Sequence, residues 1–148
     1  MSRRADVDRC SCGLVLDGPL GHAYNEEAFR YLLGLHRRRS QRSDRPFVLV
    51  LVELKQQGTL RTRIEHPVAR RLFSGLCSAL RDSDVIGWYQ DGQIAGAVLT
   101  DVGTGTWAHV SGVIARRVES TLTDAVPRTI GERLQVRVCQ IQPKLLTS

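Results

Sequence analysis

The side chains that most often perform chemistry in proteins are thinly spread along this sequence of 148 residues. Cys10 and Cys12 could give two thiolate ligands to a metal, but no second Cys or His pair follows at the spacing of a zinc site. His22, His66 and His109 belong to separate predicted elements and have no nucleophile at a matching separation. We therefore expect no metal ion, no cofactor and no catalytic residues from these groups.

Two carboxylates beside predicted strands are stronger candidates for a site. Residues 47–52 are apolar without alternation, which is typical of a strand buried on both faces, and Glu53 follows directly with Lys55 close behind. Asp91 precedes a glycine between two short apolar runs, and an Asp-Gly pair in that position predicts a β-hairpin. Both acidic groups are therefore expected where strands end.

Three helices and a last strand are predicted around these strands. The first helix begins after Asn25, a good N-cap, and ends in a run of basic residues. Apolar residues recur every four positions over residues 62–81, and Pro67 favours a regular helix start close to it. The other predicted elements are a helix that begins near Thr106 and an alternating, half-buried strand over residues 134–138.

The order of elements after the first helix is β-α-β-β-α-β. This order predicts an α+β, ferredoxin-like antiparallel sheet with both crossover helices on one face. Right-handed crossovers place the first and third of these strands side by side in the centre. We expect an N-terminal arm over residues 1–21, a single domain with an extra N-terminal helix over residues 22–143, and a C-terminal tail over residues 144–148.

The composition fits one globular domain and limits the classes of function. Hydrophobic residues make up 42% of the chain and charged residues 24%, which excludes a disordered or low-complexity segment. The formal net charge is +6, but the arginines that carry it are spread over several elements, so nucleic acid is not an expected partner. The longest apolar run is too short for a membrane span and no signal-type segment leads the chain, so we expect a cytoplasmic protein.

Four segments follow one another in the order and spacing of a known family. They are Tyr24–Phe29, Arg45–Val52, Arg81–Tyr89 and Ala95–Leu99. Together they resemble the first helix, the first core strand, the approach to the signature hairpin and the following strand of the GGDEF family. These are the diguanylate cyclase domains of bacterial cyclic di-GMP signalling, and the resemblance implies their fold, which is related to that of class III nucleotidyl cyclases.

The signature hairpin of the family, Gly-Gly-Asp/Glu-Glu-Phe, aligns with Gln90–Ile94. In the family the paired glycines let the backbone approach a triphosphate, and the acidic residues bind Mg²⁺ for phosphoryl transfer. Here Gln90 and Asp91 stand in place of the glycines, and Gly92 replaces the first acidic residue. Gln93 aligns with the metal-binding Glu, and a neutral amide is a poor ligand for a hard dication.

The first core strand departs from the family in a second place. Glu53 keeps a carboxylate where the metal-binding Asp of that strand would fall. Lys55 stands at the second acidic position, where its charge would repel a metal ion. Because one carboxylate cannot assemble a two-metal site, the resemblance implies a domain without diguanylate cyclase activity. The alternative is a residual nucleotide-binding or cyclase-like enzyme that uses Glu53 together with Asp91 after a shift in register.

One ligand-binding feature of the family is retained. Arg81 and Asp84 have the Arg-x-x-Asp spacing of its inhibitory site, which implies cyclic di-GMP as a ligand. Arginine offers a planar fork to phosphate or guanine, and aspartate accepts from the guanine edge. The competing interpretation is structural, because an arginine near a helix end followed by an aspartate at a strand start is common.

The sequence thus predicts a non-catalytic regulatory or protein-interaction module in bacterial signalling. A protein partner or a homodimer is expected, and Trp88 is a candidate for the partner surface because it replaces an arginine of the family at the edge of the sheet. An unrelated RNA-binding ferredoxin-like module is disfavoured, since the predicted sheet lacks the aromatic pairs on which RNA bases stack.

Overall fold

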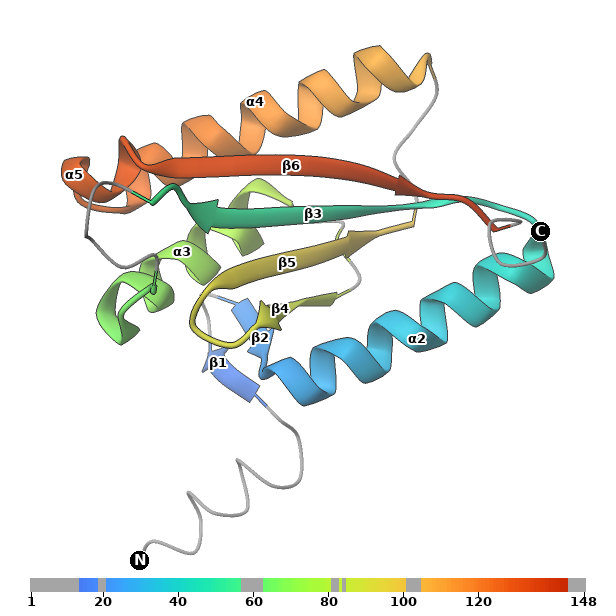
Figure 1. The fold of residues 1–148 in the computed structure, drawn as a ribbon, viewed down its shortest axis with the longest axis horizontal. Coiled ribbons are helices and arrows are strands. Elements are labelled where there is room, and N and C mark those ends of the chain that lie inside the picture. The colour runs from blue at the N-terminus through green and yellow to red at the C-terminus, as the bar shows by residue number, and fades with distance from the viewer. Residues whose placement is uncertain are drawn as a thin grey trace, which may run out of the picture.

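The computed structural model describes residues 14–18, 21–56, 63–80, 83, 85–100 and 105–143 of the chain. Over these residues it shows a six-stranded sheet with helices on both faces (Figure 1). The strands are β1 (Leu14–Gly18), β2 (Gly21–Tyr24), β3 (Phe47–Leu54), β4 (Val85–Gln90), β5 (Ile94–Leu99) and β6 (Leu134–Ile141). The helices are α2 (Glu26–Ser43), α3 (His66–Ala79), α4 (Trp107–Ala125) and the single-turn α5 (Arg128–Gly131).

The predicted ferredoxin-like unit is confirmed as β3-α3-β4-β5-α4-β6. The strand order across the sheet is β1-β2-β4-β5-β3-β6, so β3 and β5 are neighbours in its interior. β3 pairs antiparallel with both β5 and β6, and β5 pairs antiparallel with β4. The first and third strands of the unit therefore lie side by side, as the handedness of the crossovers requires.

Two N-terminal strands extend this unit and were not predicted. Residues 14–18, expected within an arm, form β1 and pair antiparallel with β2. β2 in turn runs parallel to β4, where Tyr24 lies opposite Gly87, so the sheet is mixed and not purely antiparallel. Both strands are short and lack the alternation by which a half-buried strand is recognised, and β2 joins the sheet by pairing with the remote strand β4.

The helix boundaries follow from local chemistry. Asn25 caps α2, because its side chain accepts a hydrogen bond of 2.9 Å from the Ala28 amide. α2 continues past the basic run and is closed by Asp44, whose φ of 58° is left-handed. α3 is shorter than predicted, and its proline lies in the first turn as expected. Thr106 caps α4 by accepting from the His109 amide at 3.2 Å.

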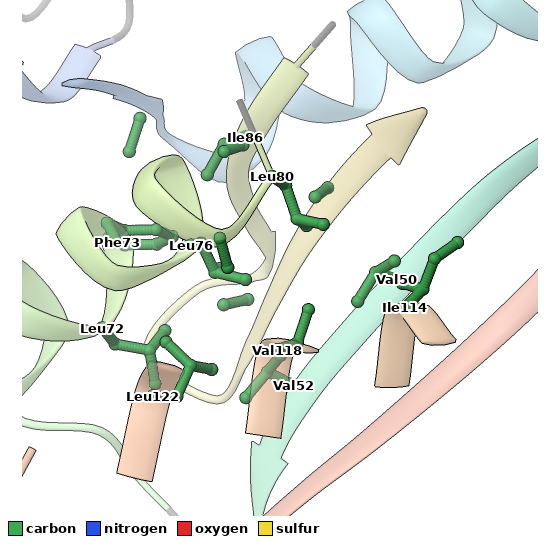
Figure 2. Packing of buried hydrophobic residues seen from close by; sticks show 14 of the residues in the cluster. Val50, Val52, Leu72, Phe73, Leu76, Leu80, Ile86, Ile114, Val118 and Leu122 are labelled. Carbon is green, nitrogen blue, oxygen red and sulfur yellow. The ribbon is translucent and has the colours of Figure 1, made fainter. Parts of the chain in front are cut away.

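The sheet has a hydrophobic core on each face, because β3 is buried along nearly its whole length. On one face α3 and α4 pack on the even-numbered residues of β3, including Val50 and Val52 (Figure 2). On the other face α2 packs on the odd-numbered residues through Phe29 and Leu33. The alternation of a strand explains why one apolar run serves both cores.

Trp88 belongs to the core of the α3 and α4 face, so its prediction as a partner surface is wrong. The residue is only 6% exposed, and its ring meets the Phe73 ring edge to face at 4.9 Å between centroids. The sequence places Trp88 near an edge of the sheet, but α3 covers this residue and buries it. Within the part of the chain that the structure describes, no helix is long and apolar enough to cross a membrane.

Candidate functional site

The β4–β5 hairpin holds residues 90–93 in a tight turn at one end of the sheet. The Gln93 amide closes the turn by donating a hydrogen bond of 2.9 Å to the Gln90 carbonyl. Gly92 has a φ of 70°, a left-handed conformation that glycine adopts without strain. Gln90, Asp91 and Gln93 are exposed. The turn therefore presents two neutral amides and one carboxylate to solvent.

The segment before α3 lies against this turn. The Ile64 amide donates a hydrogen bond of 2.7 Å to the Gly92 carbonyl. The guanidinium of Arg63 covers the same glycine, since a Cβ atom at position 92 would lie 2.5 Å from its Nη1. Nη2 of Arg63 is 3.9 Å from Oδ2 of Asp91. One arginine thus covers the backbone of the turn and faces its carboxylate.

The start of α2 holds the turn from another side. Oε1 of Glu26 accepts a hydrogen bond of 2.7 Å from the Asp91 amide. Oε2 of Glu26 also pairs with Arg30 at 3.3 Å, and the Arg30 guanidinium lies 4.6 Å from the centre of the Tyr89 ring. The N-terminal turn of α2 is therefore linked to β4 and to the hairpin by contacts across about sixty residues of sequence.

Glu53, the retained carboxylate of the first core strand, already has a cationic partner. It lies opposite Ile94 on β5 and Gln135 on β6. Its Oε2 is 3.0 Å from Nη2 of Arg137, which is one pleat further along β6 on the same face of the sheet. The Glu53 side chain is 29% exposed, so this pair is partly shielded from solvent.

Lys55 lies just past the end of β3 and is exposed. Its amide donates a hydrogen bond of 2.7 Å to the Arg133 carbonyl, and Nε of Arg133 donates to the Lys55 carbonyl at 3.1 Å. These two bonds fix the end of β3 to the turn before β6. The resemblance implies a second carboxylate at position 55. In this chain that position holds the cation of Lys55, and hydrogen bonds fix its backbone.

The electrostatics of this end of the sheet consist of separate ion pairs. Asp91 faces Arg63 and Glu53 faces Arg137, so each carboxylate has its own arginine. Among the described residues, no three histidine, cysteine or acidic side chains come together as ligands for one metal ion. A hard divalent cation takes several oxygen ligands. Glu53 and Asp91 are therefore arranged as partners for arginine.

A cavity of about 470 Å³ lies between the hairpin turn and the start of α3. Phe73 and Trp88 form its apolar wall, and Asp91 contributes from the turn. Its polar lining also includes Arg63, Arg70 and Glu65. This volume is within the range of small-molecule sites.

The other candidate residues lie outside the described part of the chain. Arg81 and Asp84, the predicted cyclic di-GMP ligands, fall in the connection between α3 and β4. Cys10 and Cys12 precede β1. Predictions about all four stay predictions.

The sequence does not indicate two arginines that determine the character of the site. Arg63 precedes a helix by three residues, and Arg137 stands on the polar face of an alternating strand. Each looks like an ordinary solvated cation in sequence. Only the register of β6 against β3, which sets Arg137 diagonally across from Glu53, could have revealed the second pair.

Comparisons with known proteins identify solved structures that have a similar fold. The GGDEF domain of FimX from Pseudomonas aeruginosa superposes with a TM-score of 0.61 at 14% identity, over 86% of this chain and 81% of that one. The diguanylate cyclase SiaD from Pseudomonas aeruginosa, solved in complex with its activator SiaC, superposes with a TM-score of 0.60 at 18% identity. That match covers 95% of this chain and 55% of SiaD. No family model matches the sequence, and no curated protein matches it either.

The chain therefore has a GGDEF-like fold, as the resemblance implied. At these identities the likeness speaks for the fold alone.

Proposed function

We propose that this chain is a non-catalytic, GGDEF-like regulatory module that acts by binding a protein partner or a second copy of itself. The observation that carries the proposal is the pairing of the two candidate carboxylates with arginines. Glu53 lies 3.0 Å from Arg137 and Asp91 lies 3.9 Å from Arg63. Each carboxylate thus faces an arginine at the end of the sheet where metal ligands would be needed, and the Glu53 pair is the closer and more buried of the two.

Phosphoryl transfer between two nucleotides needs aligned reactants and divalent cations that neutralise the developing charge. Gln93 offers only a neutral amide, and Lys55 adds a positive charge beyond β3. A metal ion at Glu53 would have to displace Arg137 from its ion pair. These features support a domain that keeps the fold and does not perform the reaction.

Two backbone amides of the turn already have partners. The Asp91 amide donates to Glu26 and the Gln93 amide donates to the Gln90 carbonyl. A close approach of phosphate to a glycine-rich backbone uses free amides. This turn therefore offers fewer free donors than such a phosphate site needs.

Binding of a protein partner is supported by one of the comparisons. SiaD was solved in complex with its activator SiaC, so a protein that contains this fold can be held in a complex. Tyr31 is the single large hydrophobic side chain that is strongly exposed among the described residues. We therefore expect a polar, charge-rich contact surface on this chain, with arginine as its commonest charged group.

Cyclic di-GMP is the small ligand we propose for the module, bound through Arg81 and Asp84. Isothermal titration of the full chain tests this. Saturable binding that Arg81→Ala abolishes and Arg117→Ala leaves unchanged is the expected result, because Arg117 is exposed on α4. Binding that both variants weaken equally, or no binding at tens of micromolar ligand, would reject Arg81 as a ligand residue.

Turnover of GTP tests the absence of catalysis separately. The full chain is incubated with GTP and Mg²⁺ or Mn²⁺, and products are separated by chromatography. We expect no product above the level of a heat-denatured control. Turnover that disappears in Glu53→Gln would instead establish the alternative, a residual nucleotide-binding enzyme. The cavity beside the turn, with Arg63 and Arg70 in its lining, is the observation that favours this alternative.

A further inference from the structure

A second cavity, which the proposed function leaves unused, lies at the far end of α2 from the hairpin turn. It has a volume of about 850 Å³ and lies where the last turns of α2 meet the start of β3 and Thr100, just after β5. Glu26, at the other end of the same helix, contacts the hairpin. The cavity is therefore separated from the turn by the length of an 18-residue helix.

The inward face of α2 changes character along its length. Its buried residues are Phe29, Leu33, His36 and Ser40, so the stripe is apolar in its first half and polar in its second. Phe29 and Leu33 pack on the sheet. His36 and Ser40 instead line the cavity. Both polar side chains have partners within the protein, since the Ser40 hydroxyl donates to the Arg45 carbonyl and the His36 ring lies 6.3 Å from the Phe47 ring between centroids.

Three arginines converge on this cavity. Arg39 and Arg42 come from the last turns of α2, and Arg45 comes from the segment that follows. All three are exposed. The described residues that line the cavity include hydroxyl groups from two serines and a threonine, and none of them is acidic.

The turn after α2 brings the third arginine back to the helix. Asp44 takes a left-handed conformation with a φ of 58° and reverses the chain. The Arg45 amide then donates a hydrogen bond of 3.3 Å to the Ser40 carbonyl, and the Ser40 hydroxyl donates to the Arg45 carbonyl. The backbone of Arg45 is therefore fixed to the last turns of α2, which carry Arg39 and Arg42.

The helix dipole explains only part of this arrangement. Cations are favoured in the last turn of a helix, where Arg42 lies, but Arg39 lies before that turn and Arg45 follows the helix. Convergence of Arg39, Arg42 and Arg45 on one concave surface adds mutual repulsion, which an anion would relieve. Guanidinium groups bind phosphate through paired hydrogen bonds, and the Ser43 hydroxyl on the cavity lining is a suitable additional donor.

We propose that this cavity binds a diphosphate group, either inorganic or carried by a nucleoside. Two linked phosphates provide enough oxygens for more than one arginine fork, and the cavity has room for a nucleoside beside them. The proposal goes beyond the proposed function, because it does not depend on Glu53, Asp91 or Arg81.

Titration of the full chain with inorganic pyrophosphate tests the site. Calorimetry at about 150 mM NaCl is expected to give saturable binding with a Kd below about 1 mM. Arg42→Gln and Arg45→Gln are each expected to weaken binding about tenfold, the loss of one charge-assisted contact. Arg117→Gln is the matched control, since it removes the same charge from an exposed position on α4.

The outcomes separate a built site from general attraction of an anion to a basic protein. Unchanged binding in Arg117→Gln with weakened binding in both cavity variants supports the site. Equal weakening in all three variants, or no saturation in the wild-type chain at that affinity, overturns it. Thermal melting of each variant verifies that it is folded, as expected for substitutions of exposed side chains.

A second titration distinguishes the two sources of the diphosphate. GDP and ADP that bind more tightly than pyrophosphate, with the same loss in Arg42→Gln, identify a nucleoside diphosphate as the ligand. Equal affinity for all three identifies the diphosphate alone. Neither result depends on the GTP turnover assay, so failure of this site and failure of the proposed function remain distinguishable.

Discussion

Gly92 is the residue on which the geometry of the hairpin turn depends most. Its φ of 70° is left-handed, and the Arg63 guanidinium occupies the space where a side chain would begin. We expect Gly92→Ala to lower the free energy of unfolding by about 1–3 kcal/mol, through backbone strain and displacement of Arg63. Urea denaturation followed by circular dichroism measures this change.

Gly112→Ala is the matched control for that substitution. Gly112 lies within α4, and a Cβ atom there would be 3.9 Å from Arg116 of the same helix. Alanine should raise the free energy of unfolding by about 0.5–1 kcal/mol at such a position, because it restricts the unfolded chain. Equal effects of the two substitutions would show that the turn imposes no special demand at Gly92.

The ion pair of Glu53 and Arg137 is the residue-scale feature most directly tied to the proposed lack of catalysis. A double-mutant cycle with Glu53→Gln and Arg137→Gln isolates the coupling of the two side chains. Because both are partly exposed, we expect a coupling of about 0.3–1 kcal/mol in the free energy of unfolding, decreasing at high salt. A coupling near zero at low salt would mean that Arg137 leaves Glu53 available to other cations.

At the scale of elements, the sequence predicts those parts whose signals are local. The continuous apolar run 47–52 and the Asp-Gly at 91–92 are recognisable because burial on both faces and a left-handed turn each demand particular residue types. Asn25 and Pro67 mark helix starts for the same reason. β1 carries no such signal, since its place in the sheet depends on pairing with β2.

The candidate site was predictable only in its composition. The residue types at 90–93, 53 and 55 can be read from the sequence, and they indicate that metal ligands are missing. The sequence does not indicate that Arg63 and Arg137 lie beside the turn and beside Glu53. Contact of Arg63 with the turn and of Arg137 with Glu53 depends on how a loop and an edge strand pack against elements remote in sequence.

The pairing of β2 with β4 depends on Gly87. A Cβ atom at this position would lie 2.8 Å from the Tyr24 amide nitrogen and even closer to its carbonyl oxygen. We therefore expect Gly87→Ala to separate the N-terminal hairpin from the sheet and to lower the free energy of unfolding by about 1–3 kcal/mol. Hydrogen exchange should then show faster exchange of the Tyr24 amide.

Gly34→Ala is a suitable comparison for Gly87→Ala. A Cβ atom at Gly34 would meet nothing nearer than Arg38 of its own helix, at 4.0 Å. Exchange in β2 should therefore stay as slow as in the wild-type chain. If Gly87→Ala also leaves that exchange unchanged, β2 does not need the close backbone approach that its position implies.

At the scale of the whole molecule, the two hydrophobic cores are joined through one strand. β3 contributes Val50 to the face covered by α3 and α4, and its neighbour Leu51 to the face covered by α2. Loss of packing on either face should therefore weaken the same strand. This coupling predicts a single cooperative unfolding transition, although the cores lie on opposite sides of the sheet.

Leu33→Ala tests that coupling with probes on the opposite face. Leu33 is buried under α2, and its truncation is expected to cost about 2–5 kcal/mol in the free energy of unfolding. The two tryptophans, Trp88 and Trp107, lie in or against the other core, so their fluorescence reports on the α3 and α4 face. In urea, the fluorescence midpoint should fall together with the circular dichroism midpoint. Tyr31→Ala, a change at an exposed position of the same helix, should leave the free energy of unfolding from both probes within about 0.5 kcal/mol of wild type. A fluorescence midpoint that stays in place while circular dichroism shifts would show that α2 and its core unfold as a separate unit.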